Sequence, residues 1–234
     1  MRATTPWLLA LTIATPMTLW SQPNTLTDAE RQAGWTLLFD GSSTAGWRGY
    51  GRADMPAGWQ VKDGALTRVD RAGDIVTTRR FRNFELELEW KVGPGGNSGI
   101  FYRGLESDEP RLHPIFESAP EMQVLDDERH ADGKSPLTAA GSNYGLYPAP
   151  RGVVRPAGEW NRVRIVVDGD RVEHWLNGQK VVSYQLGSAD WKQRVASSKF
   201  KQWPLYGTAE EGVIGLQDHG DPVWFRDIKL RELP

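Results

Sequence analysis

The chain of 234 residues contains no cysteine. Disulfide bonds, thiolate metal sites and lipid-modified cysteine anchors are therefore excluded. A chain of this length can bury a core that is large enough to fold without such cross-links. It also lacks an apolar run of the roughly 20 residues that a membrane-spanning helix needs. We expect one globular domain that is stabilised by its core.

The sequence shows no excess of one charge sign and lacks several catalytic signatures. The formal net charge is −2, and the basic and acidic residues are interspersed. Without a basic stripe, no nucleic acid is expected as a partner. The chain has no Gly-x-Ser-x-Gly, no phosphate-binding glycine loop and no His-Glu-x-x-His. These absences argue against serine hydrolases, nucleotide enzymes and zinc peptidases.

The N-terminus has the pattern of a targeting segment. Arg2 is followed by an apolar run from Trp7 to Trp20, which Pro16 interrupts. We predict a signal peptide over residues 1–21 and a periplasmic or secreted protein with no stable membrane insertion after processing. An uncleaved N-terminal anchor is the alternative. Residues 22–34 are predicted as a linker or short helix, with Thr27 and Glu30 spaced as a capping box.

Strand patterns dominate from Trp35 onwards. Residues 84–92 alternate strictly between apolar and polar side chains, which predicts a strand with Phe84 and Val92 on its inward face. Asn177-Gly178 is a strong two-residue hairpin signal. One short helix is expected near residues 188–200, with Ser188 as its N-cap. The pattern predicts an all-β fold, an antiparallel β-sandwich that forms a single domain over residues 35–234.

Two neighbouring strand patterns carry an unusual set of polar residues. On residues 97–103, Asn97 and Arg103 share one face, while Glu121 and Gln123 share one face of the strand 121–126. A carboxylate, two amides and a guanidinium can therefore meet on one sheet surface. A functional site is the favoured interpretation, and an ordinary polar sheet exterior is the alternative.

The segment 213–220 supplies further candidates. Gln217 and His219 face the same way, and Gly215 leaves space above that surface. An imidazole can carry protons near neutral pH, although a loop histidine often only bonds to a neighbour. His174 is expected to have its polar side in solvent.

Aromatic and acidic residues give weaker signals. Trp47 and Trp203 are candidate sugar platforms, although tryptophan is more often a core residue. A run of loop residues, Asp126 to Glu128 with His130, is the one pattern that favours a divalent metal. Such runs are usually solvated, so we expect no cofactor and no metal site.

Several of these motifs occur together in the order that is typical of one family. They are Leu37-Leu38-Phe39-Asp40-Gly41, Gly46-Trp47, Trp59-x-Val61-x-Asp63-Gly64, Asn97-Ser98-Gly99-Ile100, Glu121-x-Gln123-x-Leu125-Asp126, Trp160-Asn161, Asn177-Gly178, Gly215-Leu216-Gln217-x-His219-Gly220 and Phe225-Arg226-Asp227-Ile228. From about residue 33 to residue 234 the chain resembles the bacterial 3-keto-disaccharide hydrolases, also described as 3-keto-glucoside 1,2-lyase/3-keto-2-hydroxy-glucal hydratase domains. The resemblance implies a concanavalin-like jelly roll, export, and a 3-keto sugar or glycoside as substrate.

Chemistry on such a substrate needs a base, a stabiliser for an enolate oxygen and an acid for the leaving group. Glu121 is the candidate base, with His219 as the competitor. Arg103 and Asn97 are candidates for the enolate oxygen, while Gln123 and Gln217 would orient sugar hydroxyls. Strict alternation places Asp126 opposite Glu121, so Asp126 joins the site only if the strand contains a β-bulge.

Two other functions fit parts of the sequence. The spacing Glu121-x-Gln123-x-x-Asp126 is similar to the Glu-x-Asp-x-x-Glu strand of jelly-roll endoglucanases, which would make the protein a direct glycoside hydrolase. A non-catalytic carbohydrate-binding module or lectin would use the same fold without proton-transfer groups. The sequence does not predict the oligomeric state.

Overall fold

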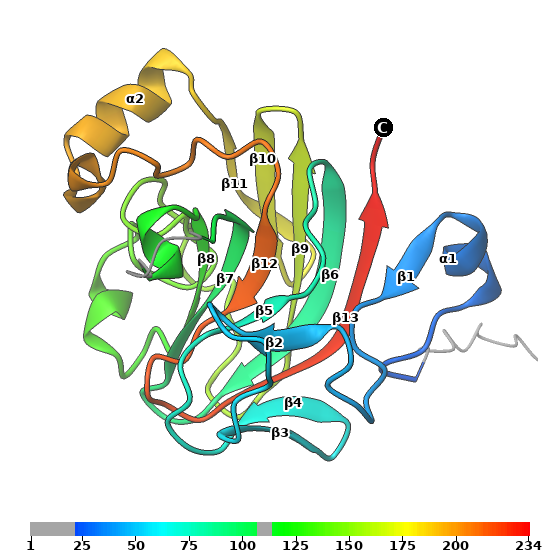
Figure 1. Cartoon of the computed structure of the whole chain (residues 1–234). Coiled ribbons are helices and arrows are strands. Elements are labelled where there is room, and N and C mark those ends of the chain that lie inside the picture. The colour runs from blue at the N-terminus through cyan, green and yellow to red at the C-terminus, as the bar shows by residue number, and fades with distance from the viewer. Residues whose placement is uncertain (1–21, 107–113) are drawn as a thin grey trace, which may run out of the picture.

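The computed structural model describes residues 22–106 and 114–234, and the predicted signal peptide 1–21 lies outside the described residues. Over these ranges, two antiparallel sheets pack face to face (Figure 1). The predicted antiparallel β-sandwich is therefore confirmed. None of the helices in the described part of the chain has the length and apolar character needed to cross a bilayer.

The larger sheet has eight strands among the described residues. Its order is β11 (Gln179–Gln185), β10 (Arg171–Leu176), β9 (Asn161–Asp168), β6 (Phe84–Val92), β13 (Val223–Glu232), β4 (Ala65–Arg68) and β3 (Trp59–Lys62), with β1 (Trp35–Leu37) also paired to β13. The order of the smaller sheet is β2 (Trp47–Gly49), β5 (Ile75–Thr77), β12 (Val213–Leu216), β7 (Asn97–Gly104) and β8 (Glu121–Leu125). Helical segments are α1 (Asp28–Gln32), η1 (Ile115–Glu117), η2 (Ala131–Lys134), α2 (Ala189–Ala196) and η3 (Lys199–Gln202).

Strand β6 shows why the sequence folds into a sandwich. Its apolar residues, from Phe84 to Val92 at every second position, are buried in the main core. Leu86 is paired with Ile165 of β9 and with Leu230 of β13, so three strands bury apolar side chains at the same level. The alternation read from the sequence is confirmed, because period-2 patterning places one face inward.

The smaller sheet is buried on both faces over β7 and β8. Ile100 is paired with Met122, and both face the main core between the sheets. On the opposite face, Phe101 packs in a second apolar cluster with Ile115 of η1 and Val213. Polar residues on that outer face are therefore covered by later segments of the chain instead of facing open solvent.

Helix α2 and the short helix η3 attach to the sandwich through stacked aromatic rings. Ser188 caps α2 by accepting a hydrogen bond from the Trp191 backbone, as predicted. The Trp191 ring stacks on Tyr184 at 5.2 Å and on Tyr206 at 5.8 Å between ring centroids. Phe200 of η3 stacks on Tyr206 at 4.1 Å. The predicted short helix near residues 188–200 is confirmed, and its position is fixed by these contacts.

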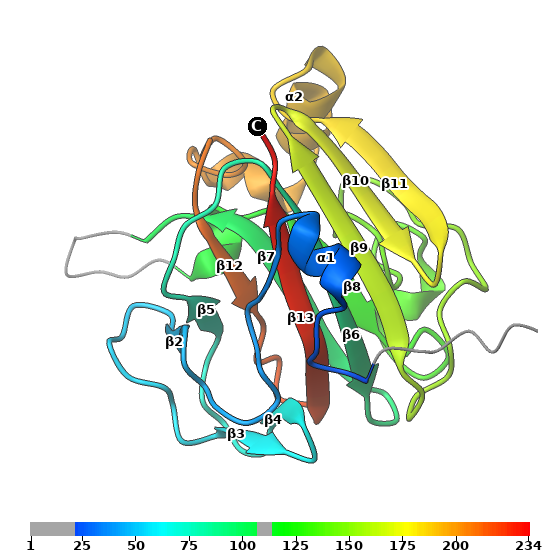
Figure 2. The same ribbon diagram turned by 90° about the vertical axis from the view of Figure 1, so that its right-hand side faces the viewer.

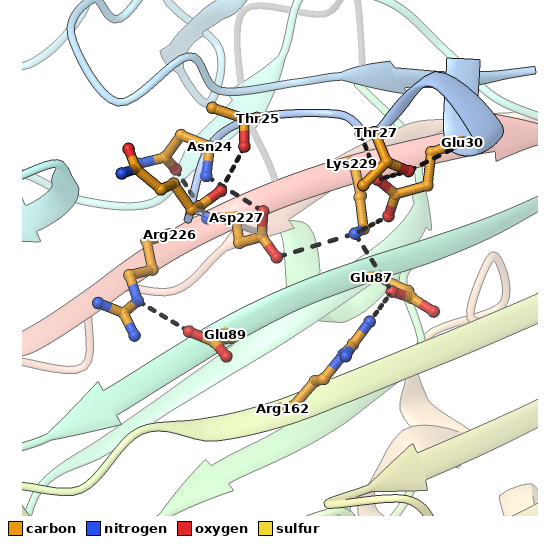
Figure 3. A network of polar contacts seen from close by, with 11 residues as sticks. Asn24, Thr25, Thr27, Glu30, Glu87, Glu89, Arg162, Arg226, Asp227 and Lys229 are labelled. Atoms are coloured by element: carbon orange, nitrogen blue, oxygen red, sulfur yellow. Dashed lines mark hydrogen bonds and ion pairs between the residues drawn. The ribbon is translucent and has the colours of Figure 1, made fainter. Parts of the chain in front are cut away.

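The N-terminal segment lies on the outer face of the larger sheet (Figure 2). Thr27 and Glu30 form the predicted capping box of α1. Glu30 Oε1 also accepts a bond of 2.5 Å from Lys229, which is only 2% exposed (Figure 3). Asn24 bonds both to the side chain and to the backbone of Asp227, which has a φ of 52° beside a register shift in β13. Residues 22–34 are therefore held to the sandwich by specific polar contacts.

His174 differs from the expectation that it is solvated. Its side chain is fully buried, with Nε2 at 2.8 Å from the Tyr102 hydroxyl and Nδ1 at 3.1 Å from the Gly141 carbonyl. Burial lowers the pKa of His174 to about 4, which keeps the ring neutral. The prediction was wrong because His174 shares the inward face of β10 with Val172 and Leu176, so its ring lies between the two sheets and meets Tyr102 of β7.

A candidate active site on the smaller sheet

A small cavity of about 160 Å³ lies on the outer face of the smaller sheet, where β7, β8 and the end of β12 meet. Strands and the turn after β12 contribute most of its polar groups, whereas loops and η3 contribute the remainder. The lining residues are Asn97, Phe116, Glu121, Gln123, Tyr144, Lys199, Phe200, Gln217 and His219. Five of the residues predicted as site residues therefore come together.

Glu121 is the acidic group of this cavity. It is the first residue of β8 and is only 8% exposed. Burial raises the pKa of Glu121 to about 8, and the nearby carboxyls of Asp74 and Asp132 act in the same direction against the charge of Lys199. A carboxyl group of this kind can accept or release a proton near neutral pH.

Gly99 of β7 and Gln123 of β8 shape the surroundings of Glu121. Gly99 has no side chain, and a Cβ there would lie 2.7 Å from the Glu121 Cδ. The Gln123 amide nitrogen, turned towards its acceptors, donates to Glu121 Oε1 at 3.2 Å and to the Ser98 carbonyl at 3.1 Å. Glycine thus makes room for the carboxyl group, and Gln123 holds it in one orientation.

Asn97 and Gln217 supply oxygen atoms that have no partner among the described residues. Asn97 Oδ1 and Gln217 Oε1 are both buried and accept no hydrogen bond there. Asn97 as a whole is 3% exposed. A buried acceptor without a donor is costly, so these atoms are suited to receive hydrogen bonds from hydroxyl groups of a bound molecule.

His219 stands at the exposed side of the cavity. Its ring lies edge-on to His130, with 6.3 Å between the ring centroids. The turn that carries it is anchored by Asp218, which bonds to Arg68 Nε at 2.8 Å and accepts from the backbone of Ala72 and Gly73. An imidazole in this position can exchange protons with both the cavity and the solvent.

Arg103 does not line this cavity. Its backbone has a φ of 52°, and the guanidinium donates to the carbonyls of Arg82 and Gly169 and to the Asn83 side chain. Arg103 lines a separate, larger cavity beside α2. The alternation rule failed here because it assumes regular strand geometry up to the last residue of β7.

Asp126 also lies apart from Glu121. The pairing of β7 with β8 contains no register shift, so no bulge returns Asp126 to the outer face. Its carboxylate accepts hydrogen bonds from the backbone of Gly95 at 2.7 Å and of Glu128 at 3.2 Å, and it lines a different cavity. In this structure Asp126 fixes two turns.

The two tryptophans singled out from the sequence occupy different surroundings. Trp47 is buried in the main core, and its Nε1 donates to the Leu38 carbonyl at 2.6 Å. Trp203 is half-buried behind the cavity wall, where its ring contacts Phe116 at 5.4 Å and Phe200 at 5.8 Å. Neither ring lines the cavity that contains Glu121.

Four further lining residues do not belong to any strand pattern; they are Phe116, Tyr144, Lys199 and Phe200. They come from loops and 3₁₀ turns that have no strand period. Tyr144 donates from its backbone to the Glu121 carbonyl at 3.1 Å and from its hydroxyl to Asp132 Oδ2 at 3.1 Å. Burial and the nearby Asp132 raise the pKa of Tyr144 to about 12. The sequence contains one signal for these residues. Ser198 is a typical N-cap residue, and it caps the turn that carries Lys199 and Phe200.

The loop after β8 uses its acidic residues and His130 as local hydrogen-bond acceptors. Asp127 Oδ1 accepts from the Ala140 backbone at 2.8 Å, and His130 Nδ1 accepts from the Asp132 backbone at 3.1 Å. Within residues 22–106 and 114–234, no group of three or more His, Cys, Asp or Glu side chains is arranged to hold a metal ion.

The fold and the site define a class of β-sandwich protein that carries a buried carboxyl group in a polar cavity on the outer face of one sheet. Within that class, the chain belongs to the family of 3-keto-alpha-glucoside-1,2-lyase-like domains. The sequence model of this family matches residues 34–231. The family resemblance read from the sequence motifs is thus confirmed.

Relatives support this assignment. The chain is 40% identical over 228 residues to a protein of Bacteroides thetaiotaomicron named 3-keto-disaccharide hydrolase, covering 86% of this chain and 79% of that protein. A crystal structure of a candidate glycosyl hydrolase from Parabacteroides distasonis matches with a TM-score of 0.83 and 37% identity, covering 91% of this chain and all of that one. A Bacillus subtilis protein with a galectin-like fold matches at 14% identity with a TM-score of 0.55, covering 82% of this chain and 92% of that one, and shows the fold alone.

Proposed function

We propose that this protein is a carbohydrate-active enzyme that cleaves 3-keto-disaccharides and related 3-keto-glycosides, with net hydrolysis of the glycosidic bond. The observation that carries the proposal is the protonatable, buried Glu121 beside two unpartnered amide oxygens. The family membership and the name of the Bacteroides thetaiotaomicron relative support the substrate class.

A ketone at C3 makes elimination the favoured route. The ketone acidifies the hydrogen on C2, so a carboxylate can remove that proton while the C2–H electrons form C2=C3 and the C3 oxygen becomes an enolate. When the enolate collapses, C3=O reforms, C1=C2 forms and the C1–O bond to the aglycone breaks. Water then adds its oxygen to C1 and a proton to C2, so the sum is hydrolysis.

The lining residues fit separate roles in this sequence. Glu121 is the base that takes the C2 proton and later returns a proton to C2. His219, on the exposed side, gives a proton to the departing aglycone oxygen. Asn97 Oδ1 and Gln217 Oε1 accept hydrogen bonds from ring hydroxyls and so orient the sugar.

Elimination is favoured over direct hydrolysis because the cavity is lined by too few carboxyl groups for a retaining glycosidase. In the described part of the chain, Glu121 is the one carboxyl that lines the cavity. A retaining glycosidase uses two carboxyls separated by about 5 to 5.5 Å. Asp126, which would be the second, binds the turns at Gly95 and Glu128. A single buried base matches the elimination route better.

We also propose that the protein acts outside the cytoplasm, in the periplasm or as a secreted enzyme. The support is the predicted signal peptide over residues 1–21. Fractionation of cells that express the full chain, followed by mass measurement of its N-terminus, tests this proposal. Cytoplasmic protein with an intact N-terminus would contradict it.

The function is tested by incubating the purified protein in deuterated water with a 3-keto-glucoside and, separately, with the unoxidised parent glucoside. Release of 3-keto-glucose with deuterium at C2 is expected from the first, and no cleavage from the second. Cleavage of the parent alone would show direct hydrolysis, and tight sugar binding without turnover would show a lectin. The variant Glu121→Gln should lose both cleavage and deuterium incorporation while remaining folded.

A further inference from the structure

The proposed elimination needs a positive group near the C3 oxygen of the substrate. Removing the C2 proton moves negative charge to the oxygen on C3, and catalysis depends on a donor aimed at that charge. Arg103, one of the two residues expected for this role, donates instead to the carbonyls of Arg82 and Gly169 and lines another cavity. Asn97, the other, lines the cavity of Glu121 but carries a neutral amide. A positive partner for the enolate oxygen must therefore come from another residue.

Lys199 is the one lysine or arginine that lines the cavity of Glu121 in the described part of the chain. Its charge acts on Glu121, where it opposes the pKa increase that burial causes. No ion pair of the described residues includes Lys199. An exposed ammonium group that lines the cavity of a buried acid, without a carboxylate partner of its own, is available to a substrate.

The position of Lys199 is fixed by its neighbours. Ser198 Oγ accepts a hydrogen bond of 3.1 Å from the Phe200 backbone and so begins the turn η3. Phe200 is 3% exposed and stacks on Tyr206, which holds the turn against the sandwich. The Lys199 Nζ lies 4.5 Å from the centroid of the Tyr144 ring and 5.3 Å from that of Phe200. The rings of Tyr144 and Phe200, which also line the cavity, thus favour the charged end beside them.

We propose that Lys199 is a catalytic residue that donates a hydrogen bond to the C3 oxygen of the substrate and stabilises the enolate formed when Glu121 removes the C2 proton. This inference rests on the proposed function. In this step the C2–H bond breaks, the proton moves to the Glu121 carboxylate, and the electron pair becomes the C2=C3 bond while the C3=O π pair moves to oxygen. Lys199 stays protonated throughout and contributes its charge and one N–H.

The test compares Lys199→Met with Lys199→Arg and with Lys201→Met. Lys201 is exposed on the same turn and does not line this cavity, so it is the matched control. For Lys199→Met we expect kcat to fall by about 10² to 10³, the loss typical of one such donor, with KM changed much less. Lys199→Arg should recover part of kcat, and Lys201→Met should behave like the unchanged protein.

A second readout separates a catalytic role from a structural one. Without the cation, the pKa of Glu121 should rise, and the increase of kcat/KM with pH should move to higher pH. The other titratable groups that interact with Glu121 or line its cavity stay the same in both proteins. They are Asp74, Tyr102, Asp132, Tyr144, Tyr206 and His219. Unaltered thermal unfolding of Lys199→Met would show that the turn remains in place.

The outcomes distinguish the two proposals. If the unchanged protein does not cleave 3-keto-glucosides, the proposed function fails and the role of Lys199 fails with it. If the unchanged protein cleaves them and Lys199→Met keeps kcat within threefold, the role of Lys199 alone is overturned. An equal loss of kcat in Lys201→Met would also overturn it, because the effect would then belong to the turn.

Discussion

The Glu121 carboxyl group occupies the space that a side chain on Gly99 would fill. A Cβ at position 99 would lie 2.7 Å from the Glu121 Cδ and 2.9 Å from its Cγ, both shorter than real Cβ contacts. Because β7 and β8 are neighbours in the smaller sheet, the position of the Glu121 carboxyl group depends on a glycine in the adjacent strand.

Replacing Gly99 with alanine should therefore displace the carboxyl group and lower kcat/KM by about 10²-fold or more, since a misplacement of about 1 Å has that effect. Steady-state kinetics on a 3-keto-glucoside measure the change. Gly93→Ala is the control, because a Cβ there would meet its nearest neighbour at 3.8 Å. Full activity of Gly99→Ala would show that Glu121 need not keep this position.

The pH dependence of activity should follow the protonation of Glu121. The base must be ionised, and burial raises the pKa of Glu121 to about 8. The value of kcat/KM should therefore rise about tenfold per pH unit below that pH. The profile is measured between pH 5 and pH 10 with stability checked at each point. A rate that is already constant from pH 5 to pH 8 would exclude Glu121 as the base.

Arg103 should matter for stability rather than for turnover. Its buried guanidinium donates to the carbonyls of Arg82 and Gly169. Replacing Arg103 with methionine leaves these acceptors unpaired and should lower the free energy of unfolding by about 2 to 4 kcal/mol. Denaturant unfolding measures the loss, and the folded variant should keep kcat/KM within about threefold.

The control for this prediction is Arg79→Met. Arg79 forms an ion pair with Glu232 in which both side chains are more than half exposed, so the change should cost under about 1 kcal/mol. A folded Arg103→Met protein with full stability and no turnover would contradict the structural role.

The N-terminal helix should contribute stability that depends on pH through Glu30. Partial burial would raise the pKa of Glu30, but hydrogen bonds from Lys229 and Thr27 outweigh this effect and lower it to about 2 (Figure 3). The folded pKa lies below the ordinary value of 4.5, so the contribution is complete above pH 4.5 and is lost as the pH falls towards 2. Glu30→Gln should unfold with about 1 to 3 kcal/mol less free energy at pH 7.

Thermal unfolding of Glu30→Gln and of the unchanged protein at pH 7 and at pH 2.5 measures this contribution. The difference in melting temperature should shrink at the lower pH. Asp28→Asn is the matched control, because Asp28 lies in the same helix with a side chain that is 86% exposed. A difference that stays constant over this range would show that the ion pair with Lys229 is not its source.

The sandwich could be predicted from the sequence because successive side chains of a strand point to opposite faces of the sheet. In β6 every second residue is apolar, and those residues form the core. The same rule correctly brought Glu121, Gln123 and Asn97 to one face of the smaller sheet, where they line one cavity. Strand periodicity therefore supplied most of the polar surface of the candidate site.

The rule failed wherever the backbone leaves the regular strand or another segment covers it. Arg103 has a left-handed backbone, so its side chain does not follow the alternation of β7. Lys199 and Tyr144 reach the cavity from irregular segments that are far from Glu121 in sequence. Contacts of this kind depend on tertiary packing, which local patterns do not encode. His174 is a different case, because the alternation of β10 itself turns it inward with Val172 and Leu176.

The cavity beside Glu121 measures about 160 Å³, which is the scale of one hexose ring and less than that of a disaccharide. A keto-sugar seated there would fill it, so the part of the substrate beyond the glycosidic oxygen would lie outside this cavity. Recognition within the cavity would then be confined to the oxidised sugar. Such an enzyme would process many different conjugates of one keto-sugar, and the range of glycosides consumed would be decided by the reaction that oxidises C3.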